Sequence, residues 1–143
     1  APGRIPSPPM YVAFFQSLAK TPQVGWQEVT RVQDLRPGDV VAWEYKTATS
    51  SGHAVIVASV PLSAEEGTWV VKVYDSTSSP HGEDTRPQDS RTTVFTASGK
   101  KSGLGHGMMA FSADPSTGAI TGYRWSPKSK TKIVTIVAAR AKS

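Results

Sequence analysis

The chain has 143 residues, of which 38% are hydrophobic and 19% charged, and it carries a formal net charge of +5. This length suits a single domain over residues 1–143 with a real core and is too short for two domains of ordinary size, and the composition excludes a disordered tail. The sequence contains no cysteine, which excludes disulfides and thiolate metal sites.

The excess positive charge lies late in the sequence. Through residue 126 the basic and acidic residues balance at eleven each, and the excess consists of Lys128, Lys130, Lys132, Arg140 and Lys142. No aromatic residues are interleaved with this cluster, so we expect a solvated strand end and no nucleic-acid partner; binding of nucleic acid through these lysines would instead collapse with added salt. No stretch is long and apolar enough to predict a membrane span, and the first residues lack the apolar core of a signal peptide.

The first predicted element is a helix over residues 8–20. Ser7 can cap its start, Pro8 suits the first helical position, and Thr21-Pro22 ends it. Apolar residues recur at helical spacing along it: Met10, Tyr11, Phe14, Phe15 and Leu18. This apolar face requires a partner surface, and none is evident in the sequence.

Beyond the helix, short apolar segments separated by turn residues predict antiparallel strands. We expect six of them, near residues 39–45, 53–60, 68–75, 107–112, 119–125 and 132–139. The predicted fold class is α+β: a helix region over residues 1–21 packed on a small antiparallel SH3-like β-barrel over residues 22–143. The irregular stretch at residues 76–91 is long for a compact domain, and loops of that length are often functional.

Two residues at strand ends are the best candidates for chemistry. His53 begins the strand at 53–60, after the flexible Ser50-Ser51-Gly52, and Asp75 ends the strand at 68–75. If these strands form a hairpin, the two side chains are cross-strand neighbours. The carboxylate can then fix the imidazole tautomer and leave the other ring nitrogen to act as a general base. The same spacing is equally compatible with a structural interpretation, in which His53 is an exposed histidine and Asp75 is an ordinary acid at a strand end.

The long loop offers further polar side chains. A metal site can be drawn from His81, Asp84 and His106, but a His-x-x-Asp pair without a third ligand at a defined spacing is a weak signal, and we predict no metal. A loop held by Arg86 to a carboxylate, lining one side of a cleft, is the better interpretation.

Two other segments have a structural interpretation as well as a functional one. Gly103-Leu-Gly-His-Gly107 is not followed by a helix, which argues against phosphate binding and favours a bulged turn with closely approaching backbones. Trp43 is either a core residue, which we favour, or a wall of the cleft near His53.

The segments Asp34-Leu-Arg-Pro-Gly-Asp-Val-Val-Ala-Trp43 and Gly52-His-Ala-Val-Ile-Val57 resemble the central strands of the NlpC/P60 and CHAP cysteine peptidases and amidases. These are papain-like enzymes that mostly cut peptidoglycan peptides. The resemblance covers about residues 22–140. A bacterial NlpC/P60-like subgroup is similar in four further places: Val73-Tyr-Asp-Ser-Thr77, His81, Asp84-Thr-Arg86 and Gly103-Leu-Gly-His-Gly107.

The resemblance implies a Cys-His-polar triad that hydrolyses an amide bond through an acyl-thioenzyme. His53 matches the histidine as general base, and Asp75 matches the third, orienting position. Trp43, Asp84 and Arg86 are the expected substrate-binding residues. The implied substrate is a cell-wall peptide or another amide, the implied location is extracytoplasmic or in the cell envelope, and no cofactor is implied.

The matching cysteine would open a helix upstream of residues 8–20, and nothing in the chain matches it. Ser7 resembles a cap and Ser17 lies inside the helix, so neither is a convincing substitute. Three explanations stay open: the chain is an N-terminally incomplete piece of an enzyme, which we favour; the cysteine belongs to another chain; or this is a non-catalytic binding module that recognises a cell-wall peptide or a partner protein.

Overall fold

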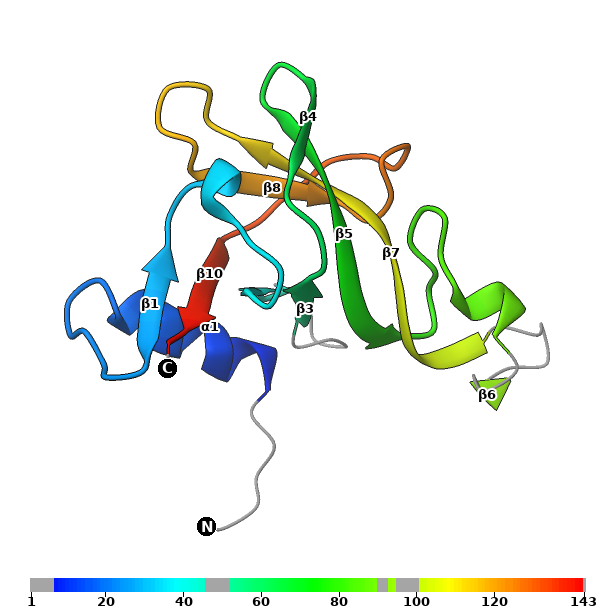
Figure 1. The fold of residues 1–143 in the computed structure, drawn as a ribbon, viewed down its shortest axis with the longest axis horizontal. Coiled ribbons are helices and arrows are strands. Elements are labelled where there is room, and N and C mark those ends of the chain that lie inside the picture. Colours follow the sequence, from blue (N-terminus) through cyan, green and yellow to red (C-terminus); the bar gives the residue numbers. More distant parts are fainter. Residues whose placement is uncertain (1–6, 46–51, 90–92, 95–100, 143) are drawn as a thin grey trace, which may run out of the picture.

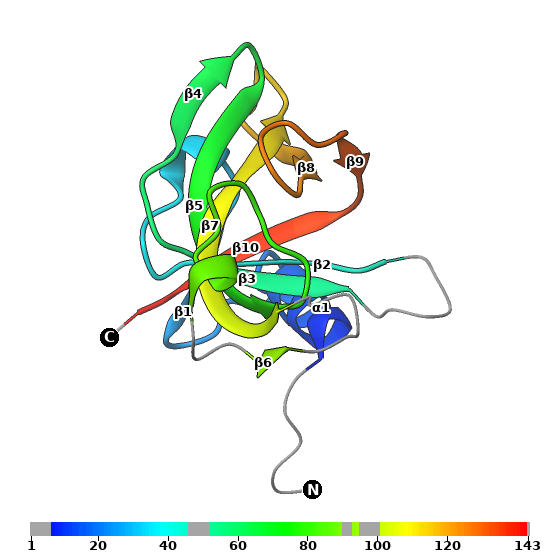
Figure 2. The same ribbon diagram turned by 90° about the vertical axis from the view of Figure 1, so that its right-hand side faces the viewer.

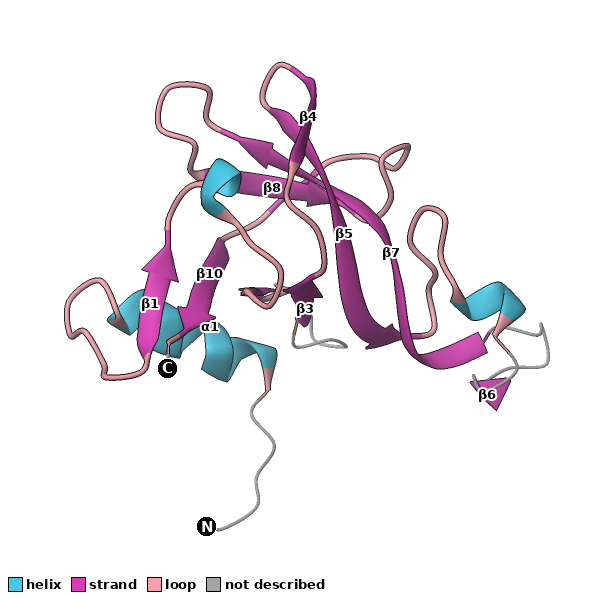
Figure 3. Cartoon of the chain, in the orientation of Figure 1, coloured by secondary structure: helices cyan, strands magenta, loops and turns pink. Residues whose placement is uncertain are grey.

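The computed structural model describes residues 7–45, 52–89, 93–94 and 101–142. They contain one α-helix, two short 3-10 helices at Val32–Asp34 and Arg86–Gln88, and ten strands (Figures 1 and 3). The helix is α1 (Pro8–Ser17), and the strands are β1 (Trp26–Val29), β2 (Val40–Trp43), β3 (His53–Val57), β4 (Leu62–Glu65), β5 (Thr68–Thr77), β6 (Thr93–Val94), β7 (Lys101–Ala113), β8 (Ile120–Arg124), β9 (Lys132–Ile133) and β10 (Ile136–Ala141). No helix in these ranges is long and apolar enough to cross a membrane.

The strands form an antiparallel sheet in the order β1-β10-β2-β3-β5-β7-β8-β9, with β4 added beside β5 and β6 beside β7. The predicted α+β class with an SH3-like barrel is wrong: the described residues form mostly antiparallel sheet with one α-helix, and the sheet is open, since no ladder among them joins β9 to β1. The cause lies in the single strand expected at 132–139. It is broken after Ile133, so that β9 pairs with β8 while β10 inserts between β1 and β2.

Helix α1 lies against β1, β10, β2 and β3 (Figure 2). Its buried side chains Val12, Phe15 and Leu18 pack on Ala42 of β2 and Ala139 of β10. The sheet therefore supplies the partner surface that the apolar face of the helix requires. The helix ends at Ser17, earlier than predicted, and the Ser7 side chain makes no capping hydrogen bond although Ser7 occupies the cap position.

A second core lies on the other side of the same strands, where the sheet curls on itself. Trp43 of β2 stacks on Tyr123 of β8 with ring centroids 4.6 Å apart, and Phe111 of β7 meets Trp43 edge-on at 6.4 Å. Trp43 is 0% exposed. It is a core residue, which confirms the interpretation favoured from the sequence, and it is not among the residues that line the pocket described below.

The longest ladder pairs β5 with β7, which run side by side in Figure 1. It extends from Thr68 opposite Ser112 to Thr77 opposite Gly103. Strand β7 thus begins six residues before the strand predicted at 107–112. The glycine-rich segment at residues 103–107 lies inside this strand, so the bulged turn predicted there is wrong.

Candidate functional site

The ends of β3 and β5 bring His53 and Asp75 together. The two strands pair antiparallel, with Ile56 opposite Tyr74 and Val57 opposite Val73, so that the start of β3 lies beside the end of β5. His53 Nε2 lies 2.6 Å from Asp75 Oδ2. The predicted contact is present, although β4 separates the two strands along the chain. The catalytic roles of the pair stay a prediction.

Asp75 is a buried carboxylate with three side-chain donors. Its side chain is 0% exposed, and Oδ2 accepts hydrogen bonds from His53 and, at 2.7 Å, from Nε2 of His81. The Arg86 guanidinium donates to Oδ1. Burial on its own raises the pKa of Asp75, but the hydrogen bonds and charges of the two histidines outweigh it and hold that pKa well below its usual range. Asp75 therefore stays ionised at neutral pH.

Arg86 and Asp84 hold the long loop to the sheet. The Arg86 side chain is 1% exposed; its Nη1 donates to Asp84 Oδ2 at 2.6 Å and its Nε to the Gly103 carbonyl at 2.8 Å. The interpretation that Arg86 ties the loop to a carboxylate is confirmed. The charged groups of both residues are buried in this network and do not line the pocket described below, and the substrate-binding role predicted for them stays a prediction.

The glycines at 105 and 107 make room for this network on one face of β7. Gly105 lies opposite Asp75, and a Cβ added to it would lie 2.7 Å from Cγ of Arg86. A Cβ on Gly107 would lie 2.8 Å from Asp84 Oδ2 and from Cβ of His81. Because side chains alternate along a strand, these two glycines leave one face of β7 bare beneath the loop. That face is where the buried charges lie.

His81 is the residue of this site whose position the sequence did not indicate. Its ring is buried in the loop, Nδ1 lies 2.7 Å from the Trp125 carbonyl oxygen, and its centroid is 4.1 Å from that of the Trp125 ring. Trp125 also contacts His53, at 5.0 Å between centroids. A loop carries no periodicity from which such a contact can be read, so His81 stood out in the sequence only as a weak metal candidate and as one place of the motif resemblance.

The metal set weighed from the sequence does not assemble. His106 lies on β7 between the two bare glycine positions and packs edge-on against Tyr74, away from His81. Among the described residues the group that can offer three ligand atoms is His53, Asp75 and His81, within 4.8 Å of one another. The imidazole-to-carboxylate distances in it are those of direct hydrogen bonds, and the Arg86 cation already lies on the other oxygen. Both observations favour hydrogen bonding over a metal.

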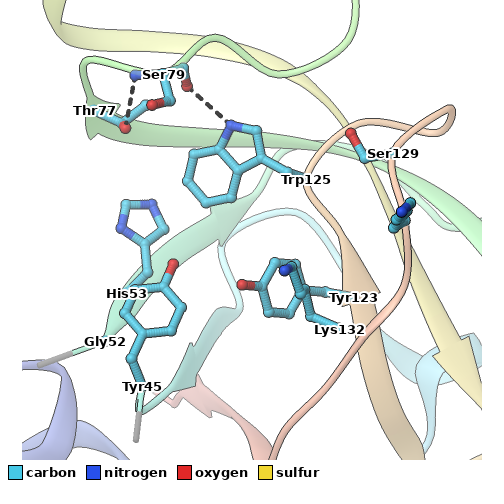
Figure 4. A pocket seen from close by; sticks show the side chains of 10 residues that line it. Tyr45, Gly52, His53, Thr77, Ser79, Tyr123, Trp125, Ser129 and Lys132 are labelled. Atoms are coloured by element: carbon cyan, nitrogen blue, oxygen red, sulfur yellow. Dashed lines mark hydrogen bonds between the residues drawn. The ribbon is translucent and has the colours of Figure 1, made fainter. Parts of the chain in front are cut away.

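A pocket of about 500 Å³ opens beside His53 (Figure 4). It is lined by Tyr45, Gly52, His53, Thr77, Ser79, Tyr123, Trp125, Ser129, Lys130 and Lys132. Trp125 is fixed in the wall by its Nε1–H, which donates to the Ser79 carbonyl at 3.0 Å. Burial and the neighbouring Tyr45 raise the pKa of Tyr123, so its phenol stays neutral. The pocket thus combines aromatic walls, hydroxyl groups and two lysines.

His53 is the polar group that joins the pocket to the buried carboxylate. Its side chain is 17% exposed, and Nδ1 makes no hydrogen bond to any residue in the described ranges. Serine and threonine hydroxyls line the pocket, but none of those described is hydrogen-bonded to this imidazole. Within the described residues, the site therefore has an imidazole bound to a buried carboxylate beside a pocket, and no hydroxyl hydrogen-bonded to that imidazole.

Comparison of the chain with protein-family models, with curated proteins and with solved structures finds no match. The likeness to NlpC/P60 and CHAP enzymes rests on the sequence motifs, so a function must be inferred from the His53–Asp75 pair and the pocket beside it.

Proposed function

We propose that this chain forms the sheet part of a cysteine hydrolase of the NlpC/P60 type, acting on amide bonds of cell-wall peptides, with its nucleophilic cysteine outside these 143 residues. The observation that carries the proposal is the orientation of His53. Nε2 is bound to the Asp75 carboxylate at 2.6 Å, and Nδ1 has no partner among the described residues beside a pocket. This is the arrangement of a general base with its orienting acid.

In the proposed reaction Nδ1 of His53 takes the proton of the thiol, and the thiolate attacks the amide carbonyl. The imidazolium returns the proton to the departing amine, which leaves an acyl-thioenzyme. His53 then takes a proton from water, whose oxygen attacks the thioester, and the proton passes to the thiolate as the acid product leaves. Asp75 keeps its charge throughout and holds the Nε2–H of His53.

The lining of the pocket supports a peptide that carries carboxylates. The charged residues that line it are Lys130 and Lys132, and Tyr123 and Trp125 offer apolar surface for a peptide backbone. A peptidoglycan substrate goes with the extracytoplasmic or cell-envelope location that the motif resemblance implies.

The test compares the 143-residue chain with the product of the complete reading frame that encodes it. Purified peptidoglycan is incubated with each, and released peptides are measured by mass spectrometry. We expect the 143-residue chain to be silent, the complete product to release peptides, and His53→Ala to abolish release while His106→Ala retains it. Turnover by the 143-residue chain that His53→Ala abolishes would contradict an external cysteine and require a serine or water nucleophile.

A binding module is the second candidate, because none of the described hydroxyls that line the pocket is activated by His53. It predicts that the complete product binds stem peptides in the pocket and releases nothing. In that case Trp125→Ala, which removes a wall of the pocket, weakens binding, and His53→Ala has a smaller effect.

A further inference from the structure

His81 has two ring nitrogens that both face hydrogen-bond acceptors. Nδ1 lies 2.7 Å from the Trp125 carbonyl oxygen, and Nε2 lies 2.7 Å from Oδ2 of Asp75. A neutral imidazole has one N–H and one lone pair, so it can satisfy only one of these contacts and would place two acceptors against each other in the second. An imidazolium donates in both.

We infer that His81 is a buried imidazolium at neutral pH, the counter-ion of Asp75 and the positioning residue for His53. Its side chain is 0% exposed and does not line the pocket, so it acts on His53 through other residues, first of all through the Asp75 carboxylate that both histidines share. The role toward His53 rests on the proposed function. The charge state of His81 does not.

The charges around His81 balance when it carries a proton. Among the described residues, the carboxylates that contact His81 are Asp75 on β5 and Asp84 in the loop, which accepts the backbone N–H of His81 at 2.9 Å, and the cation paired with both is Arg86. One further positive charge makes the buried cluster neutral. Gly107 of β7 adds no charge beside the ring, and Trp125 presents its aromatic face 4.1 Å away, which stabilises a cation.

His53 and His81 share one oxygen of Asp75, Oδ2, so the charge of His81 affects His53. Oδ2 of Asp75 is fixed by the His81 imidazolium, and Oδ1 is fixed by Arg86. The negative charge of Asp75 is therefore already balanced by His81 and Arg86. Asp75 can accept the Nε2–H of His53 while the His53 ring is neutral. His53 stays a neutral base with Nδ1 directed away from Asp75, which is the state that proton abstraction requires.

The experiment is long-range proton–nitrogen NMR of the uniformly ¹⁵N-labelled 143-residue chain at pH 7. Three histidines give three ring patterns, which His81→Gln and His106→Gln assign. We expect both nitrogens of His81 to be protonated, with no change when EDTA is added, and His53 to be the neutral Nε2–H tautomer. One unprotonated nitrogen in His81 would overturn the inference, and so would a pattern that EDTA or added Zn²⁺ changes, which marks a metal ligand.

His81→Gln also tests the coupling between the two histidines. The amide can still donate to Asp75 but carries no charge, so we expect His53 to take up the missing proton and show the imidazolium pattern at pH 7. His106→Gln is the matched control and leaves His53 neutral. A folded His81→Gln chain with His53 still neutral would overturn the positioning role. If that variant does not fold, the wild-type His81 pattern still decides the charge state, and neither measurement depends on amidase activity.

Discussion

Asp39 and Arg140, 101 residues apart in the sequence, form a forked ion pair in which two guanidinium nitrogens each lie 2.8 Å from a carboxylate oxygen. Asp39 is 1% exposed and also accepts the backbone N–H of Arg36. The pair fixes the residue just before β2 to the end of β10, and the forked geometry is the strong form of this contact. The Pro-Gly-Asp motif that suggested an enzyme family thus has a structural role here.

Removal of this carboxylate should destabilise the fold. Asp39→Ala leaves the Arg36 N–H without its acceptor and the Arg140 guanidinium with the Asp34 carbonyl but no carboxylate, and we expect the free energy of unfolding to fall by about 2 to 4 kcal/mol. Urea denaturation at pH 7 measures it. Glu66→Ala removes an exposed acid and should stay within about 0.5 kcal/mol of the wild type. Equal effects of the two substitutions would contradict a structural role for the pair.

Gly105→Ala should disturb the buried charges beneath the loop. The added Cβ would lie 2.7 Å from Cγ of Arg86, and we expect the free energy of unfolding to fall by about 1 to 3 kcal/mol although alanine suits a strand better than glycine. Leu104→Ala, on the adjacent exposed position, is the control and should have a smaller effect. A stabilised Gly105→Ala chain would show that the loop does not need the bare strand face.

Asp75 should make the stability of the chain depend on acid pH. Its pKa is lowered in the folded state, whereas the unfolded chain binds the proton near the ordinary value of about 3.9. Unfolding therefore takes up a proton between these values, so the stabilisation by Asp75 is full above about pH 5 and is lost as the pH falls. At pH 7 we expect Asp75→Asn to cost about 3 to 5 kcal/mol.

The loss measured for Asp75→Asn should shrink when urea denaturation is repeated from about pH 6 to about pH 3.5. Glu66→Gln, on the exposed acid, should differ from the wild type by the same small amount at each pH. A loss for Asp75→Asn that grows as the pH falls would have the wrong sign for a carboxyl group with a lowered pKa.

The two pocket lysines should attract carboxylates of a bound peptide. We expect Lys130→Glu and Lys132→Glu each to weaken binding of a peptidoglycan stem peptide by about fivefold at low salt, corresponding to about 1 kcal/mol, with a smaller loss as salt is added. The Trp125 indole N–H signal in NMR titrations reports occupancy of the pocket. Lys20→Glu, on an exposed residue after α1, is the control. Losses as large for Lys20→Glu would indicate a general charge effect.

Local sequence patterns were sufficient to predict the elements with a regular period of apolar residues. The apolar spacing from Met10 to Leu18 predicted α1, and alternation along β3 and β5 placed His53 and Asp75 at strand ends that meet. Both predictions depend only on the period of a helix or a strand and on antiparallel pairing. These two patterns were enough to identify His53 and Asp75, the two residues of the proposed catalytic pair.

Contacts between distant segments could not be read in this way. The glycines at 105 and 107 suggested a turn. Their actual role is to leave space for the side chains of Arg86, Asp84 and His81. Those side chains come from a loop about twenty residues earlier, so the local sequence around the glycines does not reveal this role. No strong turn residue marks the break after Ile133. The position of β10 between β1 and β2 is determined by the packing of Ala138 and Ala139 into the two cores. That long-range choice opened the sheet that the sequence predicted to close.

The position of β10 between β1 and β2 also determines when, during synthesis, this part of the sheet can form. Strands β1 and β2, made early, do not pair with each other and are joined only through residues 136–141. Until those residues leave the ribosome, one edge of β2 is unpaired and α1 lacks Ala139 in the surface it packs on. An incomplete nascent chain therefore exposes an unpaired strand edge and an apolar helix face together, so this half of the molecule is the part most prone to aggregate before the last strand is in place.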